Sequence, residues 1–322
     1  MINCFLHIVK WDGLGGAQDI GVADLPQQLP QQGGLWVHLD CNHESGREWL
    51  SSMEEVPTAV VDALYAEETR PSTTRIGDGL LLTLRGVNLN PDSDPSDMVS
   101  LRIWVTPHVM ITSRRRRLLS VQDLLQQLRA GEGPTTVADM VVLLTKSLTS
   151  RMAGTIDALE ESLSELEEAI TQSIEADQRT RLVEKRLEIM RLKRFLTPQK
   201  EAIARLCIEG ATWLDSEQQI QIKEAANDLT RFLEALESLR ERSVLMQEEF
   251  VNLHSEKMNA RMYVISILSG IFLPLGFLTG LFGINIGGMP GTENGYAFWY
   301  FCLSLLVLGS LQYALMRKSR WF

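Results

Sequence analysis

The chain has 322 residues, of which 45% are hydrophobic, and a formal net charge of −10 at pH 7. This length can bury a sizeable core in one large domain or two modest ones. The acidic balance excludes a typical nucleic-acid-binding protein, because phosphate binding needs a basic surface; an acidic surface instead concentrates cations. The four cysteines form no CxxC pair and suit a reducing compartment, which argues against a disulfide framework.

Residues 1–134 carry short apolar runs broken by clusters of Gly, Pro, Asp and Asn. Apolar runs separated by such turn-forming residues are typical of strands and short helices joined by turns. We expect a cytoplasmic α/β domain here, with a short helix at Pro57–Tyr65 and strands at Cys4–Val9, Leu35–Leu39, Leu80–Leu84 and Val99–Thr112. The pattern does not predict the strand order.

Residues 135–261 change to the spacing of long helices. One apolar face is predicted at Leu148, Met152, Thr155, Leu159, Leu163, Leu166 and Ile170. A second helix runs from about Asp177 towards Cys207, with a kink or break expected at Pro198. A third face steps by four and three through Ala225, Leu229, Phe232, Leu236, Leu239, Ser243, Met246, Phe250 and Leu253.

The third face belongs to a stretch without Pro or Gly that extends from residue 211 to residue 269. The simplest interpretation is one helix that leaves the cytoplasmic part and continues into an apolar segment. About 65 residues would make a rod roughly 100 Å long. A coiled-coil rod that serves no conduit remains the alternative for such a sustained repeat.

Eight acidic residues and no basic ones lie between Met152 and Gln178. Such a run is either a solvated helix face or, in a multimer that moves cations, a cytosolic sink. A basic cluster at residues 114–117 follows an apolar strand. We interpret it as a solvated strand end or as an ion-pair partner of the acidic helix.

Two uncharged segments, residues 262–282 and residues 296–316, are each long enough to cross a hydrocarbon core. Lys257 and Arg261 precede the first of these segments, and further basic residues follow the second in the tail, residues 317–322. The loop between the segments, residues 283–295, carries only one charged residue, Glu293. The positive-inside rule then places both ends in the cytoplasm. The sequence therefore predicts an integral membrane protein whose large N-terminal part is cytoplasmic.

Polar and small residues recur along one face that enters the first span, where such residues are costly unless they face protein or water. Hydroxyl and amide oxygens could support a hydrated cation there; the alternative is helix packing through small residues. A hairpin alone encloses no pore, so a conduit would require an oligomer. The predicted pore-lining residues are Asn252, Ser255, Asn259, Met262, Ser266, Ser269, Leu273, Gly276 and Gly280, followed by Asn285.

The first span ends in IFLPLGFLTGLFGIN, with Gly283-Ile284-Asn285 followed by IGGMPG. This end resembles the CorA-like metal-ion transporter superfamily, which carries Gly-Met-Asn at this place, and GINIGGMPG is similar to the ZntB zinc-transporter branch. Three cytoplasmic segments are similar to that branch as well: residues 67–71 (EETRP), 84–88 (LRGVN) and 97–102 (DMVSLR). The resemblance thus extends over essentially the whole chain.

The resemblance implies a homopentamer in which the cytoplasmic domain and its long helices form a funnel. Five copies of the first span would line the pore, the second spans would form an outer ring, and Asn285 would form a polar ring at the periplasmic mouth. Gly283 would permit the tight turn, and Ile284, which stands where magnesium members carry Met, favours zinc. Glu293 either attracts cations to that mouth or is a solvated loop acid.

The implied function is Zn²⁺ transport across the bacterial inner membrane, with proton-coupled uptake and with Cd²⁺, Ni²⁺ and Co²⁺ as further candidate substrates. A magnesium, cobalt or nickel channel is the alternative within the class, and a membrane-anchored coiled-coil sensor is the alternative outside it. The sequence has no P-loop, HExxH or GxSxG motif, so we expect no enzyme. No resident cofactor is expected.

Zinc prefers His nitrogen and Cys sulfur, which makes three further residues candidate ligands. Cys41 and His43 lie close in sequence to His38 and Asp40, but alternate positions of a strand point to opposite faces, so these four cannot all chelate one ion in a regular strand. A regulatory zinc site at Cys41 and His43 and an ordinary polar strand end both remain open. His254 lies near the start of the first span and either handles protons or zinc or is a packed or solvated helix residue.

Overall fold

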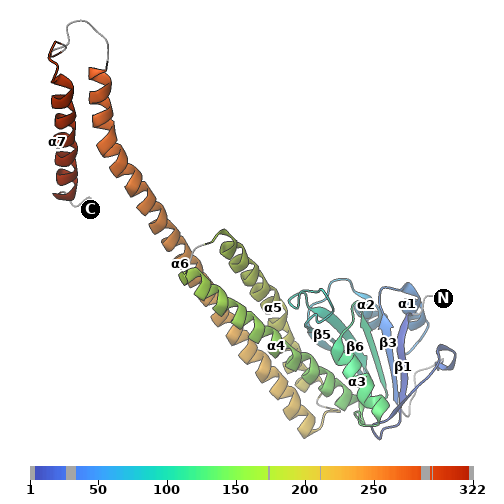
Figure 1. Ribbon diagram of the computed structural model, residues 1–322. Helices are drawn as coiled ribbons and strands as arrows, with labels where there is room; N and C mark the ends of the chain where they lie inside the picture. The colour runs from blue at the N-terminus through green and yellow to red at the C-terminus, as the bar shows by residue number, and fades with distance from the viewer. Residues whose placement is uncertain are drawn as a thin grey trace. The chain divides into compact units, whose positions relative to one another are not determined.

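The computed structural model describes residues 4–26, 34–172, 175–210, 212–283, 291 and 293–318. They form two compact units, Met1–Gln247 (unit 1) and Glu248–Phe322 (unit 2). Helix α6, Ser216–Phe282, belongs to both, so the predicted single helix that continues into the first apolar span is confirmed (Figure 1). The finer division at residues 134, 261, 282 and 295 stays a prediction.

Unit 1 is built on a seven-stranded mixed sheet with the order β2-β1-β3-β7-β6-β5-β4. Strands β3 and β7 are parallel, and each of the other neighbouring pairs is antiparallel. The mixed α/β character predicted from the sequence is confirmed. The strands are β1 (Phe5–Trp11), β2 (Ala17–Asp19), β3 (Gly34–Asp40), β4 (Ser72–Ile76), β5 (Gly79–Gly86), β6 (Val99–Val105) and β7 (Val109–Arg114).

One predicted strand, Val99–Thr112, is two strands in the structure. The chain turns between Val105 and Val109, where the Thr106 amide donates to the Val109 carbonyl at 2.9 Å. Pro107 in this turn has no amide to offer a sheet ladder, which explains why the apolar run is interrupted there. The edge strands β2 and β4 were not predicted, because each is short and largely polar.

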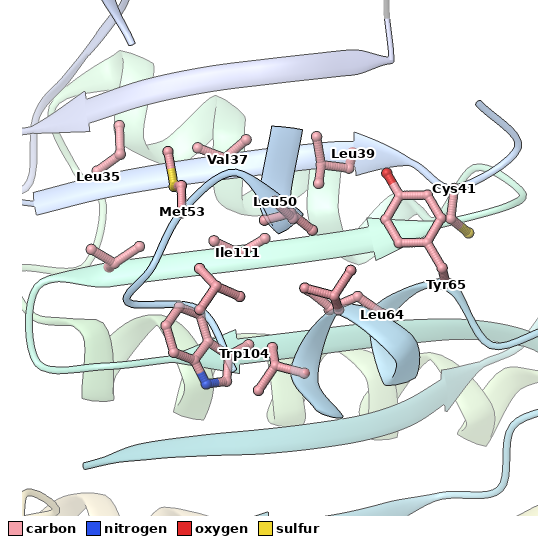
Figure 2. Close-up of a cluster of buried hydrophobic side chains, with 14 of the residues drawn as sticks. Leu35, Val37, Leu39, Cys41, Leu50, Met53, Leu64, Tyr65, Trp104 and Ile111 are labelled. Carbon is pink, nitrogen blue, oxygen red and sulfur yellow. The ribbon is translucent and has the colours of Figure 1, made fainter. Parts of the chain in front are cut away.

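Helices α1 (Glu44–Ser51) and α2 (Thr58–Tyr65) cover one face of the sheet. Figure 2 shows alternate residues of β3, Leu35, Val37 and Leu39, directed towards Leu50 of α1 and Leu64 of α2. Leu39, Leu50 and Leu64 are fully buried, and each such side chain stabilises the fold by about 2 kcal/mol. The helix predicted at Pro57–Tyr65 is thereby confirmed as α2, with Pro57 at its N-cap.

The opposite face of the sheet lies under α3 (Leu119–Ala130), α4 (Val137–Gln172) and α5 (Ala176–Glu209). Both faces are therefore buried, which is why the central strands have continuous apolar runs rather than alternating ones. Helix α5 is anchored by the Gln199 side chain, whose Oε1 accepts from the Arg85 amide at 2.7 Å and whose Nε2 donates to the Arg85 carbonyl at 2.9 Å. The Thr73 hydroxyl donates to the Ala202 carbonyl at 2.7 Å.

Within unit 1, α4 and α5 pack against each other, and side-chain contacts join both to α6 (Figure 1). The predicted apolar face of α4 is buried, except that Ile156 rather than Thr155 occupies the position after Met152. Polar side chains bridge the helices: Arg242 of α6 pairs with Glu167 of α4.

Of the kink or break predicted at Pro198, the break is wrong. Helix α5 continues through Pro198 to Glu209, because Leu196, Gln199 and Ile203 on either side of it are buried. Tertiary packing of this face outweighs the hydrogen bond that the proline removes.

The acidic residues of α4 are mostly exposed, apart from Glu167. Of the two interpretations of the basic cluster at residues 114–117, an ion pair with the acidic helix is not found among the residues that the structure describes, because the cluster has other partners. Arg115 pairs with Glu67 at 3.6 Å, Arg116 pairs with Asp97, and Arg117 donates to Gln122.

Candidate functional site

Unit 2 is a helical hairpin formed by the C-terminal part of α6 and by α7 (Ala297–Lys318). The two helices run antiparallel: the rings of Phe282 and Phe301 lie 5.1 Å apart at one end, and a Cβ placed on Gly270 would lie 3.1 Å from Met316 Cε towards the other. The most apolar windows have a mean hydropathy of 2.1 in α6 and 1.5 in α7, and neither is buried inside the protein. Both helices are long enough to cross a hydrocarbon core.

The face of α6 that contacts α7 is apolar. Its partly buried residues follow a three-and-four spacing, at Ile267, Ile271, Pro274, Leu275 and Leu278. At about 100° per residue these positions lie within one third of the helix circumference. Unit 2 thus uses this apolar face of α6 for packing within the hairpin.

The predicted pore-lining residues lie on the roughly opposite face of the same helix. Met262, Ser266, Ser269, Leu273, Gly276 and Gly280 are all exposed in the single chain. A Cβ added at Gly276 or at Gly280 would meet nothing within 4 Å. The predicted pore-lining residues of the first span are therefore not used to pack α7, unlike Gly270, and their face is left uncovered in one copy of the chain.

Pro274 lies inside α6 without ending it. Proline has no amide hydrogen, so the carbonyl of Gly270 loses its usual helical donor. One turn later the Thr279 hydroxyl donates to the carbonyls of Leu275 and Gly276, at 3.1 and 3.0 Å. The apolar span thus contains a short section in which a side chain supplements the backbone ladder.

Helix α6 ends at Phe282, and the amide of Gly283, the next residue, donates to the Thr279 carbonyl at 2.9 Å. Gly283 is thus placed directly after the last turn of α6. Ile284 and Asn285 lie outside the described residues. Glu293 is described and is exposed in the turn before α7.

The beginning of unit 2 carries the remaining predicted pore residues and His254. Asn252, Ser255 and Asn259 are exposed, and the Ser255 hydroxyl donates to the Val251 carbonyl at 2.8 Å. His254 is exposed, and its ring stacks on Phe250 with 6.3 Å between ring centroids.

The cluster around Cys41 is divided between the two faces of the sheet. Cys41 is buried on the α1/α2 face (Figure 2), where burial raises the pKa of its thiol. His43 caps α1. His38 is fully buried and lies between the Thr112 hydroxyl (2.7 Å from Nδ1) and Arg114 Nε, which donates to its Nε2 at 2.9 Å.

Burial and the neighbouring Arg114 hold the pKa of His38 well below its usual value. Its ring nitrogens are occupied by protein groups, so His38 is a structural residue rather than a metal ligand. Within the described part of the chain, no group of three or more His, Cys, Asp or Glu side chains is placed to hold a metal ion. The predicted role of Cys41, His43 and His254 as ligands stays a hypothesis without geometric support.

Residues 31–318 match the family model described as CorA-like Mg²⁺ transporter protein. The chain belongs to this family. It is 35% identical over 317 residues to the zinc transport protein ZntB of Pectobacterium carotovorum, covering 98% of this chain and 95% of the relative. It is 36% identical over 321 residues to the divalent cation transporter CmaX of Pseudomonas aeruginosa, covering 96% and 94%.

The fold of this CorA-like protein is also that of a solved relative. The structure of the full-length CmaX protein matches it with a TM-score of 0.84 and 35% identity, covering 98% of both chains. The family resemblance stated from the Gly-Ile-Asn segment is confirmed. The protein is a membrane protein with two C-terminal spans whose class of function is divalent metal-ion transport, and it is not an enzyme.

Proposed function

We propose that this CorA-like protein transports Zn²⁺ through a homopentameric pore. The observation that carries the proposal is the uncovered face of α6, where Ser266, Ser269 and Gly276 lie opposite the α7 contact. Polar groups in a hydrocarbon core are costly unless they face protein or water. Several copies arranged around an axis would direct these faces to a shared hydrated path.

In the proposed assembly, α6 of each copy lines the pore, α7 forms an outer ring, and the helices of unit 1 form a cytoplasmic funnel. Gly283, Ile284 and Asn285 would form the outer mouth, and Glu293 would attract cations to it. The basic residues at both ends of the hairpin support an inner-membrane orientation with both termini in the cytoplasm. The whole-length similarity to ZntB proteins supports zinc as the substrate.

Proton-coupled uptake is part of the proposal. In the described part of the two spans there is no Asp or Glu that could relay a proton, so coupling would have to use water or the cytoplasmic part. The alternative within the family is a channel for magnesium, cobalt or nickel. It is favoured by the family description and by the broader substrate name of CmaX.

The decisive experiment measures Zn²⁺ entry into proteoliposomes with a lumenal zinc dye, with and without an inward proton gradient. Acceleration by the gradient is the expected result for proton-coupled uptake. Zinc entry that does not respond to the gradient would indicate a passive channel, and Mg²⁺ entry without Zn²⁺ entry would contradict the zinc assignment.

The outer mouth is tested by Asn285→Ala in the same assay. We expect the variant to assemble as one large closed oligomer and to lose or deregulate zinc flux, because an apolar methyl group cannot replace an amide oxygen beside a cation. Flux and selectivity equal to those of the unsubstituted protein would remove Asn285 from the path. A monomer in sedimentation of the detergent-purified protein would refute the pore.

A further inference from the structure

A cavity of about 780 Å³ lies on unit 1, between the edge strand β4 and helix α5. Strand β4 has a neighbour on one side only, since it is the last strand of the sheet. The wall from α5 is one helix face, because its lining residues Met190, Arg194, Pro198, Glu201 and Arg205 follow one another at intervals of three or four. Nothing in the proposed transport path involves this cavity.

The lining of the cavity is basic although the protein as a whole is acidic. Arg70, Arg194, Arg205 and Lys193 line it, against the single carboxylate of Glu201. The three arginines are exposed and form no ion pair with any residue that the structure describes.

Other arginines of unit 1 have acidic partners. Arg129 pairs with Asp19 at 2.8 Å, and Arg191, on the same helix as Arg194, pairs with Asp94 at 2.9 Å. These two arginines are neutralised by acidic partners, whereas the three arginines of the cavity are not. The half-buried Arg85 is affected by one of the cavity arginines: partial burial and then the positive charges of Arg102 and Arg194 lower the pKa of Arg85 to about 10.

The cavity also offers groups that suit the remainder of an organic phosphate. Ser72 and Thr74 of β4 present hydroxyl groups at its wall, and Met190 lies 60% exposed beside them. Guanidinium groups bind phosphate through paired hydrogen bonds and stack on flat rings. A bare inorganic phosphate would leave most of this volume and the apolar wall unused.

We propose that this cavity binds a phosphate-bearing ligand of nucleotide size, with Arg70 and Arg205 as its phosphate ligands and Met190 against its base. The proposal is independent of which metal ion the protein transports. It also gives the ligand a route to the transmembrane helix. Lys193 lines the cavity and pairs with Glu237 of α6, so a bound phosphate competes with Glu237 for the same ammonium group.

The test measures binding of a fluorescent ATP analogue to the full-length protein in detergent, by anisotropy, with EDTA present so that no metal ion bridges the phosphates. Unlabelled ATP is expected to displace the probe and adenosine is not. The double variant Arg70→Ala/Arg205→Ala is expected to bind at least about tenfold more weakly, because each substitution removes a charge-assisted contact.

The matched control is Arg179→Ala/Arg181→Ala, which removes the same charge from exposed positions of α5 outside the cavity. It should bind the probe within about twofold of the unsubstituted protein, since a general field effect of exposed charges is small. The elution volume and the thermal unfolding midpoint of both double variants report whether the fold is retained.

Three results would overturn the proposal. The first is no binding of the probe by the unsubstituted protein, and the second is an equal loss of affinity in the cavity and control variants. The third is displacement by short-chain phosphatidylglycerol as effective as by ATP, which would assign the basic residues to lipid. None of these three results would change the outcome of the zinc-flux assay, so the nucleotide-binding proposal and the zinc-transport proposal can be refuted separately.

Discussion

The Gln199 side chain replaces a missing strand in the sheet. Strand β4 pairs with residues Gly79 to Thr83 of β5. Arg85 of β5 lies beyond the end of β4, so its backbone groups on that side have no strand to pair with. The Gln199 amide fills that place with hydrogen bonds of 2.7 and 2.9 Å, and it is fully buried. We predict that Gln199→Leu destabilises unit 1 by about 2 to 6 kcal/mol, because leaving a buried donor and a buried acceptor unpaired costs about 1–3 kcal/mol each.

The measurement is urea unfolding of the full-length protein in detergent, followed by tryptophan fluorescence. Five of the seven tryptophans lie in unit 1, so the signal reports mainly on that unit. The midpoint should fall while the slope stays unchanged. Gln127→Leu, at an exposed position of α3, is the matched control and should leave the midpoint unaltered. A Gln199→Leu midpoint equal to that of the control would refute the strand-replacement reasoning.

Three further predictions test other parts of the molecule. Because His38 is held neutral when folded while the unfolded side chain titrates near 6.5, the unfolded state takes up the extra proton as the pH falls. Stability should therefore be full above about pH 6.5 and should fall below it, by at most about 1.4 kcal/mol per pH unit for this residue. His38→Gln should make the free energy of unfolding depend less steeply on pH below about 6.5. Adding His7→Gln should reduce this dependence further, since burial also lowers the pKa of His7. An unchanged pH dependence would contradict a neutral His38 in the folded protein. Ser266→Leu should cut zinc flux into proteoliposomes by at least about tenfold without altering the oligomer size, because it places an apolar side chain on the proposed hydrated face; unaffected flux would place Ser266 outside the path. Gly270→Val should weaken the hairpin, because a Cβ at this position would lie only 3.1 Å from Met316 Cε, whereas a Cβ at Gly276 would meet nothing within 4 Å in the single chain. Equal thermal midpoints for Gly270→Val and Gly276→Val would argue against the α6–α7 contact.

The elements with strong periodicity were predictable from the sequence. The long α6 helix and its buried face follow from an uninterrupted three-and-four spacing, and the central strands follow from apolar runs. The short edge strands were not predictable, because Ser72–Ile76 has little apolar signal and is held by pairing with β5. Pro198 misled the prediction because burial of its neighbours on the sheet is a tertiary effect.

The candidate sites show the same division. The uncovered face of α6 was predictable, since helical spacing alone separates Ser266 and Ser269 from the apolar positions. The surroundings of His38, Cys41 and His43 could not be predicted, because β3 ends at Asp40 and the residues on either side of this end lie in different parts of the fold. The basic cavity could not be predicted from the sequence, because Arg70 and Arg205 are 135 residues apart and line one cavity only through the packing of α5 on β4.

The parallel pairing of β3 with β7 has a consequence for synthesis of the chain. The other pairs of the sheet join segments close in sequence, whereas Leu35 pairs with Val109, 74 residues later. The antiparallel pairing of β1 with β2 and β3 can form early, but the free edge of β3 has no partner until β7 has left the ribosome. Non-local pairing is slow, and unpaired apolar edges associate with other chains. The unpaired edge of β3 is therefore the place where nascent chains are most exposed to misassembly.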